Sequence, residues 1–205
     1  MDIINWFCEI LKEWQTLIAA LIALYAAHRT IGAMRSQVAA ESARHAELMK
    51  RKEMAARAQM PDALSEIGTY VENMGEYLCG GIQQLPGAPT VAVSTLKQVI
   101  EHIEDSASAR TFELVSLFQV HRARTTDQLG NWLDHETRYD LVLLQAHVNS
   151  LFDYARNESE TGPSGDLCRV DMNNALNNAF PLQYVVRNAG EFDDVQKIID
   201  RRHQA

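Results

Sequence analysis

Histidines and carboxylates are the residues of this chain whose spacing could create a metal site or an acid–base pair. His102 stands within Glu-His-Ile-Glu-Asp and His135 within Asp-His-Glu, but side chains one position apart on a helix point in different directions. The Glu-x-x-His spacing of helical di-metal sites does not occur, and His135 and His147 lie twelve residues, about 18 Å, apart on one predicted helix. We therefore predict no metal site, and we interpret His121 and His147 as partly buried or rim histidines.

Nucleophilic and phosphate-binding chemistry is equally unsupported by the sequence. Gly-x-Ser-x-Gly does not occur, and Cys79 and Cys168 have no flanking signature of a catalytic thiol. They are expected to be reduced thiols that pack as small hydrophobic side chains. The glycine-rich run at residues 80–90 follows no predicted strand, so it is interpreted as a connection between helices.

The acidic residues fall into two groups that we interpret as solvated helix faces: Glu101, Glu104 and Asp105, and the pair Asp193 and Asp194. Basic residues interleaved with aromatic ones, the pattern of nucleic-acid binding, are missing. We therefore assign no catalytic, cofactor-binding or metal-binding residue and no cofactor. A cavity that gathered ionisable groups such as His102, Glu104 and His147 would instead indicate an enzyme with unfamiliar helical chemistry.

The segment that organises the rest of the chain is the apolar stretch Trp14–Met34. Fifteen uncharged residues precede Arg29 and cover about 22 Å of a ~30 Å hydrocarbon layer, whereas all twenty-one residues cover about 31 Å. Arg29 then lies near the end of the stretch, where its side chain can reach the headgroups. Trp6 and Trp14 suit one membrane interface, and the acidic N-terminus argues against a cleaved signal peptide. We predict a membrane anchor at residues 1–34, with its span at 14–34.

The charges that flank this stretch predict its orientation. Between Arg29 and Arg57, seven Lys and Arg residues oppose three Glu, whereas Lys12 is the one basic side chain before the stretch. Positive residues close to a span stay in the cytoplasm, so we expect the N-terminus outside and the bulk of the chain inside. The basic juxtamembrane segment Arg29–Arg57 also favours anionic lipid of the inner leaflet, which makes membrane lipid the first predicted partner.

A helical stalk is predicted over residues 35–60, because the segment is alanine-rich and contains neither Gly nor Pro. Apolar and small residues form a thin heptad seam, which leaves a coiled coil and a single helix, solvated or docked on the distal domain, as alternatives. The seam comprises Met34, Val38, His45, Met49 and Ala56.

Residues 61–205 are predicted to form a cytoplasmic bundle of about six helices, so the whole chain is expected to be all-α. Apolar residues recur there at spacings of three and four, and no segment alternates like a strand. We expect helices near 61–78, 95–105, 109–124, 134–158, 167–180 and 191–202. The fourth of these has the strongest stripe and should be central, whereas the polar loop at 157–166 should be the most flexible part.

Individual residues within these helices carry further expectations. Gly68 and Gly75 weaken the first helix, since glycine lowers helix propensity. The third helix is expected to bury Phe112, Val115 and Phe118, together with Leu117. Net charge over residues 58–205 is acidic, with eleven Lys and Arg against twenty-one Asp and Glu, and excludes nucleic acid as a partner.

A resemblance accompanies the anchor and stalk. The sequence WQTLIAALIALYAAHRTIGAMRSQVAAESARHAELMKR, about residues 14–51, resembles small uncharacterised bacterial and prophage-borne proteins that begin with an aromatic-Gln-Thr-Leu-Ile-Ala span followed by a basic helix. The resemblance implies a single-pass protein of the bacterial inner membrane. It implies no activity and assigns no functional residue.

These observations favour a membrane-anchored interaction protein, whose cytoplasmic domain binds a protein partner or its own copies. Two alternatives stay open. One is a soluble or peripheral all-α protein in which the first thirty residues pack as a hydrophobic helix. The other is a membrane-tethered enzyme with unrecognised chemistry, although the motifs above favour a protein that is not an enzyme.

Overall fold

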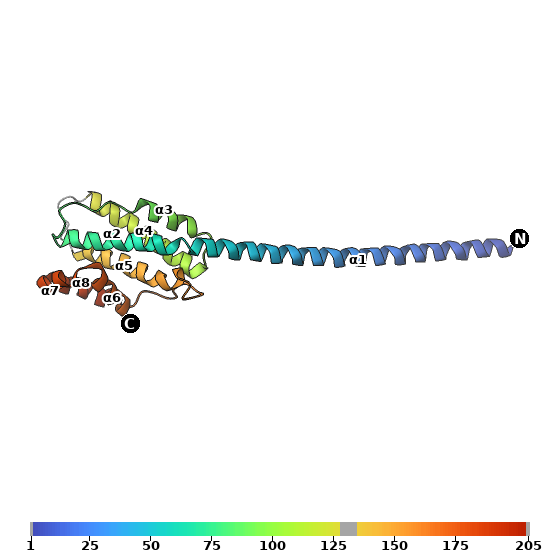
Figure 1. Ribbon diagram of the computed structural model, residues 1–205. Coiled ribbons are helices and arrows are strands. Elements are labelled where there is room, and N and C mark those ends of the chain that lie inside the picture. Colours follow the sequence, from blue (N-terminus) through green and yellow to red (C-terminus); the bar gives the residue numbers. More distant parts are fainter. Residues whose placement is uncertain (1, 128–134, 204–205) are drawn as a thin grey trace. The chain divides into compact units, whose positions relative to one another are not determined.

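The computed structural model describes residues 2–127 and 135–203, and all regular structure within those ranges is helical. This confirms the predicted all-α class, in which a long N-terminal helix precedes a helical bundle (Figure 1). The helices are α1 (Asp2–Arg57), α2 (Met60–Leu78), α3 (Thr90–Val99), α4 (Asp105–Asp127), α5 (His135–Ala155), α6 (Arg169–Ala179), α7 (Leu182–Arg187) and α8 (Ala189–Arg202).

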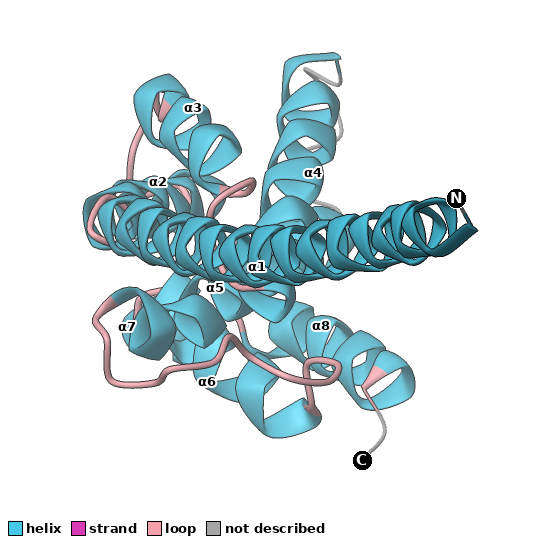
Figure 2. Ribbon diagram, turned by 90° about the vertical axis from the view of Figure 1, so that its right-hand side faces the viewer, coloured by secondary structure: helices cyan, strands magenta, loops and turns pink. Residues whose placement is uncertain are grey.

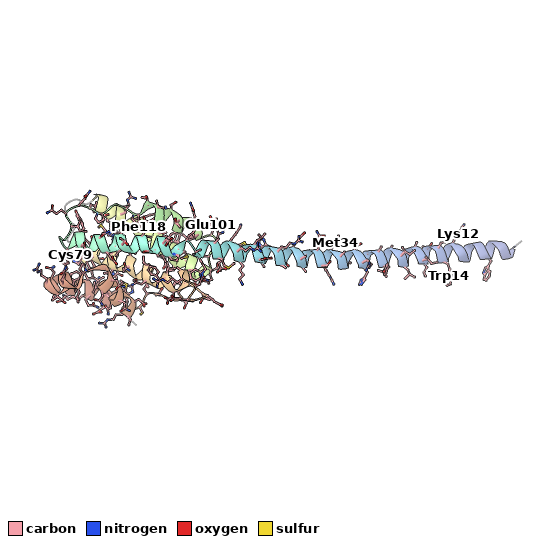
Figure 3. The ribbon with its side chains drawn as sticks, viewed as in Figure 1. Lys12, Trp14, Met34, Cys79, Glu101 and Phe118 are labelled. Carbon is pink, nitrogen blue, oxygen red and sulfur yellow. The ribbon has the colours of Figure 1, made fainter. Side chains whose placement is uncertain are left out.

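The chain divides into two compact units, Met1–Lys50 and Arg51–Ala205. Within the first unit, every residue from 14 to 50 is exposed. Trp14 and Met34, which bound the apolar stretch, both lie on α1 and are 62% and 61% exposed (Figure 3). Among the described residues, one helix is long and apolar enough to cross a membrane, and its apolar window lies near the N-terminus.

The second unit begins before the end of α1. Ala56 and Arg57 are buried in the core of this unit, and so is Met60 at the start of α2. The compact unit therefore includes residues 51–60, which the sequence reading had placed in the stalk. Pro61 occupies the first turn of α2, where its missing N–H would have no helical partner in any case.

Helix α5 is the central helix of the bundle, as its strong apolar stripe predicts. It contacts α2, α4, α6 and α8. Figures 1 and 2 show α3 and α4 on one side of the α2 and α5 pair, with α6, α7 and α8 on the other. The stripe that packs inward is entirely buried and comprises Leu141, Leu144, Val148, Leu151 and Ala155.

The other helices overlap the expected segments but differ from them at their ends. Helix α3 (Thr90–Val99) begins and ends earlier than the helix expected at 95–105, and α4 extends further than expected in both directions. Residues 182–187, where no helix was expected, form the short helix α7, and α8 begins at Ala189, two residues before its expected start. Residue 134, the expected start of the central helix, lies outside the described residues.

The buried face of α4 differs from the prediction at Phe112. Val115 and Phe118 are buried, but Phe112 is 62% exposed. The buried stripe of α4 instead repeats at spacings of three and four through polar residues, which hydropathy does not reveal. It comprises Ala107, Thr111, Leu114, Phe118, His121 and Thr125.

Arg57 ties the end of α1 to the end of α5. Its guanidinium donates to the carbonyl oxygen of Tyr154 from Nε (3.1 Å) and Nη2 (2.6 Å), and Nη2 also donates to the carbonyl of Ser159 (2.7 Å). The same group lies 4.0 Å from the centroid of the Tyr154 ring. The last carbonyls of a helix have no partner within it, so this buried cation supplies donors to one of them, the carbonyl of Tyr154.

Gly75 allows α2 and α6 to approach each other closely. A Cβ atom at this position would lie 2.0 Å from the carbonyl oxygen of Ala179 at the end of α6. At Gly68, two turns earlier on α2, the nearest atom would be Val148 Cγ1 at 4.0 Å, an ordinary contact. The two glycines that weaken the helix in the sequence therefore differ in their structural role.

Substitution of the two glycines should separate these roles. Gly75→Ala should lower the free energy of unfolding by about 1–3 kcal/mol, because backbone must move to admit the methyl group. Gly68→Ala, the matched control on the same helix, should raise it by up to ~1 kcal/mol through better helix propensity. Urea denaturation followed by circular dichroism measures both. Equal effects from the two substitutions would contradict the close approach of α2 and α6.

Candidate functional site

Six ionisable side chains line a cavity of about 370 Å³ between α4, α5 and α8. The segment between α5 and α6 completes its wall. The lining consists of Arg110, Glu113, Leu143, His147, Asp166, Leu167, Arg202 and His203. A second cavity of about 390 Å³ adjoins it and shares Arg110, Asp166 and Leu167. We call the first of these the Arg110 cavity.

Residues 156–168 connect α5 to α6 and include the segment 157–166 that was expected to be the most flexible part of the domain. Several hydrogen bonds fix the path of this loop. The carboxylate of Glu104, immediately before α4, accepts from the backbone N–H of Gly162 (2.9 Å) and of Ala107 (3.2 Å). Ser106 also donates its hydroxyl to the same oxygen. Glu104 thus caps α4 and holds the loop at once.

Gly162 fits this position because it has no side chain. A Cβ atom there would lie 2.3 Å from the backbone nitrogen of Ala107. The loop therefore reaches the first turn of α4 through a backbone contact that only glycine permits. This explains one of the two glycines that made the segment look merely flexible in the sequence.

Carbonyl groups of the loop accept hydrogen bonds from buried or half-buried cations and imidazoles. Arg110 on α4 donates to the carbonyl of Gly165, and Arg57 donates to that of Ser159. His203, just after α8, places Nδ1 2.7 Å from the carbonyl oxygen of Leu167. Three side chains from separate helices or helix ends therefore hold the loop as one wall of the Arg110 cavity.

Both ring nitrogens of His203 have partners within the protein. A carbonyl oxygen only accepts, so Nδ1 carries the proton that bonds Leu167. Nε2 lies 2.9 Å from the hydroxyl oxygen of Tyr139, within hydrogen-bond distance. Arg202 lies against the same Tyr139 ring, 4.7 Å from its centroid, and pairs with Glu136 at 3.2 Å. The ring atoms of His203 are thus occupied within the protein.

His147 differs from His203 because one of its nitrogens has no partner. Its Nδ1 is buried and makes no hydrogen bond, and the nearest carboxylate oxygen, Oε2 of Glu113, lies 3.8 Å away. Burial, followed by the nearby charges of Arg110 and His203, lowers the pKa of His147 from its ordinary value of 6.5 to about 4. At neutral pH this imidazole is therefore uncharged.

His121 is a buried histidine of another kind. It is fully buried on α4 against the ring of Tyr70, with the ring centroids 6.4 Å apart. Burial lowers its pKa to about 4, and Arg124 contributes to the same shift. Both His121 and His147 are more deeply buried than the partly buried or rim placement that the sequence suggested.

The structure does not bring His102, Glu104 and His147 into one cavity. His102 lines a separate hollow with Lys52 and Gln98, and Glu104 is engaged with the loop. No group of three or more His, Cys, Asp or Glu side chains within the described ranges could hold a metal ion.

Glu104 is not a residue of a solvated face, contrary to the reading of its acidic cluster. Glu101 and Asp194 are exposed as expected, and Asp194 pairs with Lys197 at 2.7 Å. Glu104 differs because a single sequence does not show that the loop residue Gly162 returns to the start of α4.

The lining of the Arg110 cavity suits binding better than covalent catalysis. The side chains that line it include no Ser, Thr, Cys or Lys nucleophile among the described residues. Sequence reasoning identified His147 but missed Arg110, Asp166 and His203, which come from different elements. A usable signal was the spacing of Arg110, three residues after Ala107 and four before Leu114, which places the three residues on one face of a helix.

Comparison with known proteins adds no assignment to this geometry. No protein-family model matches the chain, and no curated protein or solved structure is significantly similar to it. The resemblance of residues 14–51 to bacterial single-pass proteins therefore stays a prediction.

Neutralising Glu104 should test the attachment of the loop. Hydrogen bonds from Ser106, then Gly162 and Ala107, hold the pKa of Glu104 at about 2, below its ordinary value of 4.5. A carboxyl whose pKa is lower in the folded state stabilises that state above its unfolded pKa. The stabilisation is lost as pH falls from 4.5 to 2.

Glu104→Gln should therefore lower the free energy of unfolding by about 1 kcal/mol at neutral pH, as loss of a helix cap does. The difference from the unsubstituted chain should shrink as pH falls through that window. Urea denaturation at several pH values measures it. Glu101→Gln removes the same charge from an exposed neighbour (Figure 3) and should have little effect. If the two variants were alike at neutral pH, Glu104 would not hold the loop.

Proposed function

We propose that this protein is a single-pass protein of the bacterial inner membrane that holds an acidic helical domain at the cytoplasmic face. The observation that carries the proposal is the exposure of the stretch Trp14–Met34. No residue of this stretch is buried, and its large apolar side chains are 49–68% exposed. These side chains are Trp14, Leu17, Ile18, Leu21, Ile22, Leu24, Tyr25, Ile31 and Met34.

An exposed apolar stretch of this size favours an apolar surrounding. Contiguous exposed apolar surface is uncommon on soluble monomers and marks a contact with lipid or protein. The length of the stretch matches the hydrocarbon layer, and its backbone polar groups are paired within α1, as lipid requires. Membrane lipid is therefore the environment that this segment fits best.

Orientation follows from the charges on α1. The excess of Lys and Arg over residues 29–57 supports a cytoplasmic location for the residues that follow the span. The same basic segment would lie next to the anionic headgroups of the inner leaflet. The acidic balance of residues 58–205 disfavours close contact of the domain with that surface and with nucleic acid.

For the domain itself we propose that it binds a protein partner or a second copy of the chain. Helix α7 supports this, since it buries no residue and leaves Leu182 and Val186, one turn apart, each 70% exposed. Purification of the full chain in detergent tests this part. A chain that elutes alone and as a monomer would contradict it.

The anchor is tested by extraction of membranes with alkaline carbonate. The unsubstituted chain should stay in the membrane pellet. Leu21→Arg combined with Leu24→Arg should shift it to the supernatant, because each Arg near a bilayer centre costs about 2.5–3.5 kcal/mol. Both leucines are exposed, at 57% and 68%, so the bundle should still fold.

The matched control places the same two charges on exposed apolar residues of the bundle. Val170→Arg combined with Val186→Arg should leave the chain in the pellet, since these positions are 65% and 70% exposed and lie outside the stretch. Release of the unsubstituted chain by carbonate would instead favour the peripheral alternative.

The orientation is tested by the thiol of Cys168, which is free and exposed. In a Cys8→Ala, Cys79→Ala chain, a membrane-impermeant maleimide should label Cys168 only after the cells are lysed. The reagent should reach it in intact spheroplasts if the bundle faces the periplasm. Labelling before lysis would therefore overturn the cytoplasmic orientation.

A further inference from the structure

We propose that the Arg110 cavity binds a small oxyanion, a carboxylate or a phosphate, between Arg110 and His147. This goes beyond the membrane role proposed above and does not depend on it. The cavity volume of about 370 Å³ lies at the lower end of the range for small-molecule sites, so it suits a compact ligand.

Arg110 supplies a buried cation with donors to spare. Only 7% of the residue is exposed. Of its five N–H donors, one bonds the carbonyl of Gly165, and Nη1 lies 3.6 Å from Oε2 of Glu113, beyond hydrogen-bond length. No further partner of its guanidinium is found among the described residues. A buried guanidinium with N–H groups that lack an acceptor can bind an oxyanion through two hydrogen bonds.

His147 supplies the second contact. It is 93% buried, as its exposed fraction is 7%, and its Nδ1 has no hydrogen-bond partner in the described structure. Buried polar atoms are nearly always paired, and His147 lines the cavity, so a polar group bound in the cavity would supply the missing partner. As an N–H, Nδ1 can donate to the same oxyanion that Arg110 binds.

Glu113 shows that an oxyanion suits this place. One carboxylate oxygen of Glu113 lies 3.6 Å from Nη1 of Arg110 and 3.8 Å from Nδ1 of His147, within ion-pair distance but beyond hydrogen-bond length. The Glu113 side chain is 58% exposed, so it can move away from both groups without unburying apolar surface. A free ligand is not tethered to α4 and can come closer to both donors.

The other charged groups at the cavity do not occupy the donors of Arg110 and His147. Arg202 is engaged with Glu136, and both ring nitrogens of His203 are bonded within the protein. Asp166 is exposed and, like Glu113, carries a charge that opposes an anion. Protonation of His147 would favour the anion, so binding should tighten as pH falls.

The test uses the full chain in neutral detergent, with ¹³C-labelled histidine observed by NMR at about pH 6, where unperturbed imidazoles titrate. Inorganic phosphate and acetate are added separately against chloride at equal ionic strength. Either oxyanion should shift the His147 resonance, assigned with His147→Gln, and raise the pKa of that ring. The stronger of the two shifts identifies the ligand as phosphate-like or carboxylate-like.

Arg110→Met should abolish the shift, but it also removes the hydrogen bond from Arg110 to the loop at Gly165. Glu113→Gln is therefore the second variant, because it leaves that hydrogen bond in place. Removal of the competing charge about 4 Å from the site should tighten binding by roughly threefold to tenfold. Glu101→Gln, the matched control outside the cavity, should leave affinity unchanged. The proposal is overturned if neither oxyanion shifts His147 more than chloride does, or if Glu113→Gln and Glu101→Gln bind alike.

Discussion

The contact on which the second unit depends is the guanidinium of Arg57 against Tyr154. This single buried cation donates to the carbonyl of Tyr154 near the end of the central helix α5, covers the Tyr154 ring and bonds the carbonyl of Ser159 in the following loop. The hydroxyl of Tyr154 in turn accepts from the backbone N–H of Glu104 and donates to Glu53. The end of α1, the end of α5 and the start of α4 therefore meet at one side chain. Apolar packing alone could not specify this junction, since helix ends expose polar backbone groups.

The loop between α5 and α6 is likewise held by side chains that bond its backbone groups, and here several side chains do so. Its composition offers almost no apolar surface, yet Arg57, Glu104, Arg110 and His203 fix its backbone through hydrogen bonds. Polar attachments of this kind leave charged and polar atoms next to one another at the edge of the loop. The Arg110 cavity is the result, and its unpaired His147 nitrogen lies where α5 passes behind the loop. The attachment of the loop and the candidate site therefore have a common physical origin.

The helices were predictable where apolar residues alone define the buried face. On α2, α5 and α8 the apolar residues that recur at spacings of three and four are buried, because burial of aliphatic side chains fixes helix rotation. The rotation of α4 was not predictable in this way, since Thr111, His121 and Arg110 occupy its buried face and Phe112 does not. Gly75 and Gly162 were also unpredictable, because the atoms they approach belong to distant parts of the sequence. The candidate site depends on four separate segments, and only His147 had been singled out.

The two buried histidines make unfolding of the bundle a proton-consuming reaction. His121 and His147 have pKa values of about 4 in the folded chain, whereas an unfolded histidine titrates near its ordinary value of 6.5. Between those values both rings are mostly neutral when folded and mostly charged when unfolded, so each takes up close to one proton as the chain opens. Their contribution to stability is complete above 6.5 and declines as pH falls toward 4. A mildly acidic solution therefore lowers the free energy of unfolding of the bundle, because protons bind the unfolded chain more tightly, and it does so before the carboxylate of Glu104 begins to titrate.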